Sequence, residues 1–70
     1  MRYLFSQAHG NSTTVAIIEN YEVKDGTVYA TKVGKFAGWI NGEEVYEACS
    51  PVKFIAGGGP WSMTEYVGQL

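Results

Sequence analysis

Hydrophobic and polar residues alternate along much of the chain, a pattern typical of β-strands rather than helices. The clearest stretch surrounds Asp25-Gly26, a dipeptide favoured in two-residue hairpin turns because both turn positions need a positive φ. Residues 14–24 before this turn and 27–33 after it are rich in β-branched and aromatic side chains. They predict an antiparallel hairpin with this register across the turn: Lys24 opposite Thr27, Val23 opposite Val28 and Glu22 opposite Tyr29.

Asn41-Gly42 is a second dipeptide of the same kind, flanked by strand-like sequence at 36–40 and 43–49. A two-residue loop here predicts a second hairpin with these pairs: Ile40 with Glu43, Gly38 with Val45 and Ala37 with Tyr46. The glycine in the middle pair indicates a bulge or bend, of the kind that turns corners in small barrels. Residues 43–49 also fit a short helix, and the hairpin is the favoured of the two interpretations.

The remaining sequence predicts an opening strand over residues 2–6 and a further strand over 52–56, after Pro51. The run Gly57-Gly58-Gly59-Pro60 then predicts a flexible break. In the tail, Ser62 and Glu65 have capping-box spacing. Four apolar side chains of the tail recur at helical intervals, which predicts a C-terminal helix of about two turns: Met63, Tyr66, Val67 and Leu70.

These elements predict a mainly β fold, in which five to six short antiparallel strands form a meander that curls into a small SH3-like or OB-like barrel. The short C-terminal helix would dock against it. A flat sheet with one face buried in a dimer is the alternative. The length of 70 residues predicts a single domain, 1–70.

Composition adds an expectation of self-association. A chain this short buries only about 60% of its unfolded surface, and small domains are usually supplemented by disulfides, a metal or oligomerisation. Cys49 is the only cysteine, and His9 is the only other strong zinc ligand, so neither a disulfide nor a zinc site is expected. Because 46% of the residues are hydrophobic and 14% aromatic, we expect a homo-oligomer, most simply a homodimer.

The net charge and the absence of targeting signals limit which compartment and which partners we expect. The net charge of −2 lacks the Lys/Arg excess that non-specific nucleic-acid binding needs, so nucleic acid is possible but not favoured. No apolar run approaches the length of a membrane span, and the N-terminal apolar run is too short for a signal peptide. Together with the lone cysteine, these features predict a cytoplasmic protein that does not bind membranes.

No catalytic constellation is apparent. His9 stands among loop-forming residues and Cys49 near a strand end, with no motif that pairs them. The glycine run is not followed by the Gly-Lys-Ser/Thr of a phosphate-binding loop, so it indicates a hinge. We therefore expect neither enzymatic activity nor a cofactor.

The surplus of aromatic residues is the one feature of the composition that indicates a function, because tryptophan and tyrosine are favoured at protein interfaces. We expect a non-enzymatic module that binds a protein partner, for example a phage or bacterial accessory or inhibitor protein that acts by occlusion. The alternative is a nucleic-acid-binding or nucleotide-binding small β-barrel, which would interleave lysines with aromatic rings. The candidate binding residues are Trp39, Trp61, Lys32, Lys35, Lys53, Glu43, Glu44 and Glu47.

Overall fold

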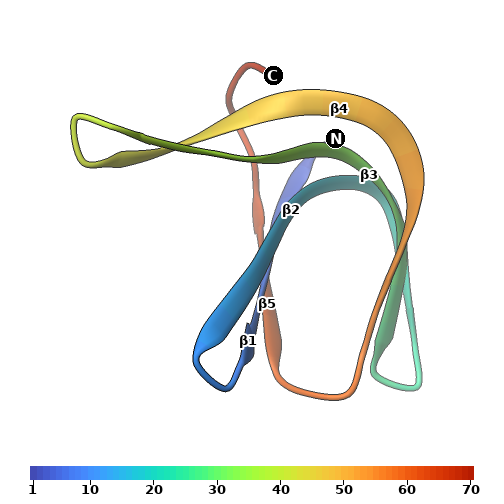
Figure 1. The fold of residues 1–70 in the computed structure, drawn as a ribbon. Coiled ribbons are helices and arrows are strands. Elements are labelled where there is room, and N and C mark those ends of the chain that lie inside the picture. The colour runs from blue at the N-terminus through green and yellow to red at the C-terminus, as the bar shows by residue number, and fades with distance from the viewer.

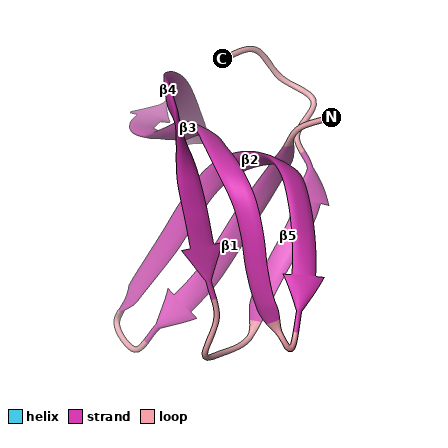
Figure 2. Ribbon diagram, turned by 90° about the vertical axis from the view of Figure 1, so that its right-hand side faces the viewer, coloured by secondary structure: helices cyan, strands magenta, loops and turns pink.

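The structure is a computed structural model that describes residues 1–70, and it contains five antiparallel strands in one open sheet and no helix. The strands are β1 (Tyr3–His9), β2 (Ser12–Lys24), β3 (Thr27–Ile40), β4 (Glu43–Ala56) and β5 (Trp61–Glu65). Their order in the sheet is β4-β3-β2-β1-β5, so the first four strands form a meander and β5 returns to β1 (Figures 1 and 2). The predicted mainly β meander is thus confirmed. No helix long and apolar enough to cross a membrane is present.

Both predicted hairpins are present, and their turns have the expected backbone conformation. Asp25 and Gly26 adopt φ angles of 52° and 75°, and Asn41 and Gly42 adopt 52° and 80°. The whole predicted register at the first turn is confirmed, as are the first two pairs and the bulge at the second. The helical alternative for 43–49 is wrong, because these residues belong to β4.

The third predicted pair of the second hairpin is wrong by one residue. Tyr46 lies opposite Phe36, and Ala37 is left without a partner between two regular pairs. A bulge inserts one extra residue into one strand and so changes which side chains share a face beyond it. This shift determines which rings meet in the site described below.

The predicted C-terminal helix is wrong. Residues Trp61–Glu65 form strand β5, which pairs with β1 and places Met63 opposite Phe5. A helix of two turns is unstable alone, whereas the strand pairs its backbone with an otherwise open edge of β1. Trp61 and Met63 alternate toward the core at the same time. Pairing with a distant segment therefore overrides the local capping pattern.

The core lies inside the curl of the sheet, which Figure 1 shows as an arch of β2, β3 and β4. Phe5 is fully buried at its centre, with its ring centroid 5.1 Å from that of Phe54 and 6.0 Å from that of Trp61. Since Phe54 belongs to β4 and Trp61 to β5, one β1 side chain contacts both edge strands and holds the sheet curled. The other fully buried members of this cluster are Ala16, Ile18 and Val28.

The connection between β4 and β5 is fastened to the end of this core. The buried Gln7 side chain donates hydrogen bonds from Nε2 to the carbonyl oxygens of Gly57 and Gly59, at 3.2 and 3.3 Å. The Trp61 indole N–H donates to the carbonyl of Gly26 at 3.3 Å. The glycine run therefore joins two strands that converge at one end of the sheet, and not a strand to a helix.

Strands β3 and β4 bend sharply at their middle. The β2–β3 register shifts next to Gly34, and in β4 the pairing with β3 skips the three residues 49–51. Pro51 is tolerated there because β4 is an edge strand, where a ladder hydrogen bond can be absent. Beyond the bend, residues 35–48, hereafter the distal hairpin, swing out to one side of the sheet (Figure 1).

Gly34 lets the chain pack closely at the bend. A Cβ atom at this position would lie 2.9 Å from Leu70 Cδ2 and 3.0 Å from Ile17 Cβ. The absence of a side chain therefore admits the C-terminal leucine against the outer face of β2 and β3. As a result Ile17 is fully buried, although it faces away from the core around Phe5.

Candidate functional site

A cleft opens between the outer face of β1 and β2 and the distal hairpin. Its volume is about 380 Å³. One wall comes from β1 and β2 and the other from β3 and β4, so it is a product of the bend. We call it the aromatic cleft, and its lining residues are Leu4, Ser6, Thr13, Val15, Phe36, Trp39, Glu44 and Tyr46.

The bulge of the distal hairpin creates the aromatic wall. Phe36 and Trp39 are three positions apart, and in a regular strand they would project from opposite faces. Ala37 is the extra residue, and Gly38 adopts a φ of 138°, which residues with a side chain rarely adopt. Both rings consequently face the cleft, with Tyr46 opposite Phe36 in β4.

The rings form a continuous row of edge-to-face contacts. The centroid of Phe36 lies 5.7 Å from that of Trp39 and 5.9 Å from that of Tyr46, with interplanar angles of 74° and 72°. Tyr46 continues the row to Tyr66 of the C-terminal tail, at 5.7 Å and 80°. This is the favoured geometry for aromatic pairs. Nevertheless, Trp39 at the outer end of the row is 65% exposed.

Glu44 is the only charged side chain that lines the aromatic cleft. The Tyr46 hydroxyl donates a hydrogen bond to Glu44 Oε2 at 2.7 Å. Burial, this hydrogen bond and the negative charge of Glu44, with a smaller contribution from Tyr66, raise the pKa of Tyr46 to about 12. The phenol therefore stays protonated at neutral pH and holds the carboxylate in place.

The other charged residues predicted for the site do not reach the aromatic cleft. Lys35 and Glu47 form an ion pair at 3.5 Å, and their ladder position places them on the opposite face of the hairpin from Phe36. Glu43 shares that opposite face, because neighbouring residues of a strand alternate. The acidic cluster of the sequence is thus divided between two faces.

The predicted lysine and aromatic surface is not assembled either. Lys32 lies opposite Val52 in the ladder, and Lys53 lies opposite Thr31. These two successive pairs project from opposite faces of the sheet, so the two lysines point apart. Trp61 is half-buried against the core, and only Trp39 of the two tryptophans belongs to the aromatic cleft.

Sequence reasoning missed Phe36 and Tyr46 as site residues. The signal that could have found them was the bulge at Gly38, which the pairing pattern did indicate. Choosing the extra residue at position 37 would have placed Phe36 opposite Tyr46 and beside Trp39. The lining from β1 and β2 had no local signal, because it depends on the bend of β3 and β4.

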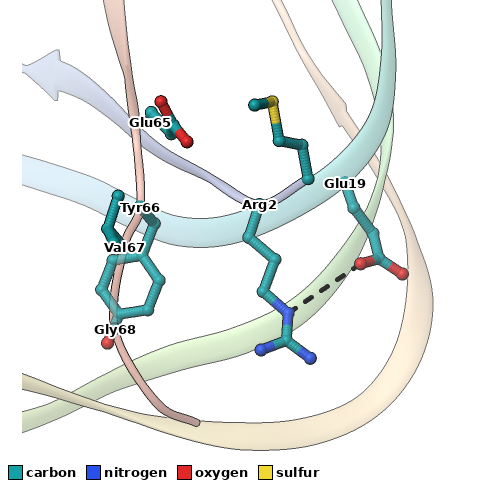
Figure 3. Close-up of a pocket in the computed structure, with 7 residues that line it drawn as sticks. Arg2, Glu19, Glu65, Tyr66, Val67 and Gly68 are labelled. Carbon is teal, nitrogen blue, oxygen red and sulfur yellow. Dashed lines mark ion pairs between the residues drawn. The ribbon is translucent and has the colours of Figure 1, made fainter.

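A larger hollow of about 490 Å³ lies between the two chain ends, around Arg2, Glu19 and Glu65 (Figure 3). The Arg2 Nε atom lies 4.0 Å from Glu19 Oε2, and both side chains are substantially exposed. Because two carboxylates and only one guanidinium line this hollow, it is not suited to binding an anion. In addition, no three His, Cys, Asp or Glu side chains of the chain are grouped so that they could hold a metal ion.

His9 and Cys49 lie in different parts of the sheet. His9 is exposed at the end of β1, next to the turn into β2, and Cys49 is a free, half-buried cysteine in the bend of β4. Strands β2 and β3 lie between β1 and β4 in the sheet. The aromatic cleft, with its exposed tryptophan and single carboxylate, is therefore the best-formed candidate site. Comparison with protein-family models, with curated proteins and with solved structures returned no match for this chain.

Proposed function

We propose that this protein is a non-enzymatic interaction module that binds a protein partner in its aromatic cleft. The observation that carries the proposal is Trp39, which is 65% exposed above a cavity of about 380 Å³. Large apolar side chains exposed together on a small protein mark interaction sites more often than chance. Tryptophan and tyrosine also dominate the energetic centres of protein interfaces.

The aromatic cleft is suited to side chains from a partner segment. Its volume falls in the range of small-molecule and side-chain pockets, about 300–1,000 Å³. The edge-to-face contacts around Phe36 hold the aromatic wall in place, so little conformational entropy is lost on binding. Action by occlusion of a partner surface would need only such contacts and no catalytic group.

We further propose that the curled sheet is an SH3-like rather than an OB-like barrel. An OB-fold is a Greek-key barrel, whereas here each of the first three strands pairs with the strand that follows it, and β5 pairs with β1. Fold alone does not imply function, so the functional proposal rests on the aromatic cleft.

The test is a selection of random peptides displayed on phage. The library is selected on the wild-type protein and counter-selected on Trp39→Ala, which removes the exposed ring. We expect peptides that bind the wild type at least tenfold more tightly than the variant. Their contacts should map to the aromatic cleft by NMR shift changes. Recovered peptides that bind both proteins equally, or no recovered peptides, would contradict the proposal.

The electrostatics of the aromatic cleft favour a protein over a nucleic acid, because the carboxylate of Glu44 repels phosphate groups. A titration of the Trp61→Phe variant with single-stranded oligonucleotides checks this, since Trp39 is then the only tryptophan. We expect no quenching up to roughly 100 µM oligonucleotide, the weak end of non-specific affinities. Quenching that disappears with added salt would favour the nucleic-acid alternative instead.

Self-association stays a prediction, and one surface supports it. Tyr29 and Ile55 lie opposite each other in the β3–β4 ladder, and both are exposed. They stand on the face turned away from the core, beside the unpaired edge of β4. Light scattering on the purified chain tests the expectation, with Ile55→Lys as the variant that should shift a dimer to monomer. A strict monomer at working concentration would contradict it.

A further inference from the structure

The aromatic cleft carries a negative charge that no positive group of the chain balances. Glu44 lines it, and the ion pairs of the chain join other residues: Arg2 with Glu19, Lys24 with Glu22, and Lys35 with Glu47. No cation of the chain therefore neutralises the Glu44 carboxylate. A positively charged group entering the aromatic cleft would find a carboxylate without a counter-ion.

A hydrogen bond also orients the carboxylate. Its Oε2 atom accepts the hydrogen bond from Tyr46, which leaves Oε1 for a donor from outside. Glu44 lies directly opposite Trp39 in the β3–β4 ladder. Directly opposite residues have Cβ atoms about 5 Å apart and project from the same face, so the carboxylate stands beside the indole.

A cation placed between these groups gains from both. It is attracted to the face of an aromatic ring, most strongly to that of tryptophan, and to the carboxylate. A planar guanidinium stacks on the ring while its N–H groups donate to the carboxylate. An ammonium group is a strongly hydrated point charge, which can pair with the carboxylate but cannot stack on the ring at the same time.

We propose that the aromatic cleft receives an arginine side chain from the partner segment, with its guanidinium against Trp39 and paired with Glu44. The apolar side chains of Leu4 and Val15 line the opposite wall and can pack against the methylene stem of the arginine. This assignment rests on the proposed function, because it names the chemistry of the segment that the same cleft would bind.

The test uses the peptides recovered in the selection described above. We expect arginine at a fixed position in most of them. Replacing that arginine by citrulline, its neutral isostere, should weaken binding about tenfold, equivalent to about 1.4 kcal/mol. Replacement by lysine should weaken binding by a smaller factor, about threefold.

The matched control lies one residue away in this chain. Glu44→Gln and Glu43→Gln remove the same charge, but only Glu44 lines the aromatic cleft. We expect Glu44→Gln to lose about tenfold in affinity for the arginine peptide and nothing for the citrulline peptide. Glu43→Gln should change both affinities less than twofold. Both residues are exposed, so both variants should fold, which circular dichroism would verify.

The outcomes separate this inference from the proposed function. Peptides that depend on Trp39 but carry no basic residue, or that bind Glu44→Gln unchanged, would overturn the arginine assignment while the proposed function stands. Equal losses in Glu43→Gln and Glu44→Gln would also overturn it, because they would indicate long-range attraction rather than contact. A lysine peptide that binds as tightly as the arginine peptide would overturn the choice of arginine. Peptides that ignore Trp39→Ala would instead overturn the proposed function itself.

Discussion

The two tryptophans occupy contrasting environments, and their alanine variants should differ accordingly in stability. Trp39 is 65% exposed, so folding hides about a third of its side chain. Because a tryptophan can bury up to about 250 Å², that third is roughly 90 Å², or about 2 kcal/mol at 25 cal/mol per Å². The denatured chain already hides part of this area, so we expect Trp39→Ala to cost about 1–2 kcal/mol.

Trp61 should be the more costly residue to remove. Its ring packs against Phe5 in the core, and its indole N–H donates to the Gly26 carbonyl. Large-to-small substitutions of this kind cost about 3–5 kcal/mol. A 70-residue domain has a total stability of roughly 4–10 kcal/mol, so Trp61→Ala should lose a large share of it. Trp61→Phe keeps a ring and should lose about 1 kcal/mol, the usual net contribution of one hydrogen bond.

Urea denaturation followed by circular dichroism measures these differences without depending on tryptophan fluorescence. The free energy of unfolding is obtained from the midpoint and slope of each transition. The order of stability should be wild type, then Trp61→Phe and Trp39→Ala close together, then Trp61→Ala. If Trp39→Ala proved as destabilising as Trp61→Ala, Trp39 would be a structural residue and the aromatic cleft would not be a free binding surface.

Four substitutions test the geometry and electrostatics around the aromatic cleft. Gly38→Ala should cost about 1–3 kcal/mol in urea denaturation through backbone strain alone, because its φ is 138° and nothing lies within 4 Å of the added Cβ; a neutral result would contradict the bulge. Gly34→Ala should cost about 1–3 kcal/mol by crowding Leu70, and deleting Leu70 in the same chain should recover part of that loss. Since the folded-state pKa of Tyr46 is raised to about 12, the unfolded chain releases this proton first as pH rises. The stability from this group is therefore complete below pH 10 and is lost between pH 10 and 12. Tyr46→Phe should flatten that loss, and Glu44→Gln should lower the pKa of Tyr46 in a spectrophotometric titration.

Local sequence was sufficient for the two hairpins. The two-residue turns need positive φ angles at both positions, and Asp25-Gly26 and Asn41-Gly42 are among the few dipeptides that adopt them readily. Each turn then sets the register of the two strands beside it. Those signals act over a few residues, so they are visible without any knowledge of the rest of the chain. The alternation in β2 was harder to interpret, because Ala16, Ile17 and Ile18 are consecutive and all buried. Both faces of β2 are covered at that point, so hydrophobic and polar residues do not alternate there.

The tail shows why a local signal can fail. The spacing of Ser62 and Glu65 favours a helix N-terminus, but these residues pair with β1, at the other end of the chain. The backbone hydrogen bonds of five residues and the burial of Trp61 and Met63 outweigh a single cap. Such long-range pairing leaves no mark in the sequence of the tail itself.

The sequence by itself determined the strand-rich class of this protein, its two tight turns and the presence of a bulge near Gly38. The tertiary structure alone decided that β5 completes the sheet and that Phe36, Trp39 and Tyr46 share one face. A bulge shifted by one residue reverses the direction of every side chain beyond it, and the bend at Gly34 turns that face toward β1 and β2. The aromatic cleft therefore depends on contacts between segments far apart in the chain, whereas the turns depend on the backbone preferences of two residues each.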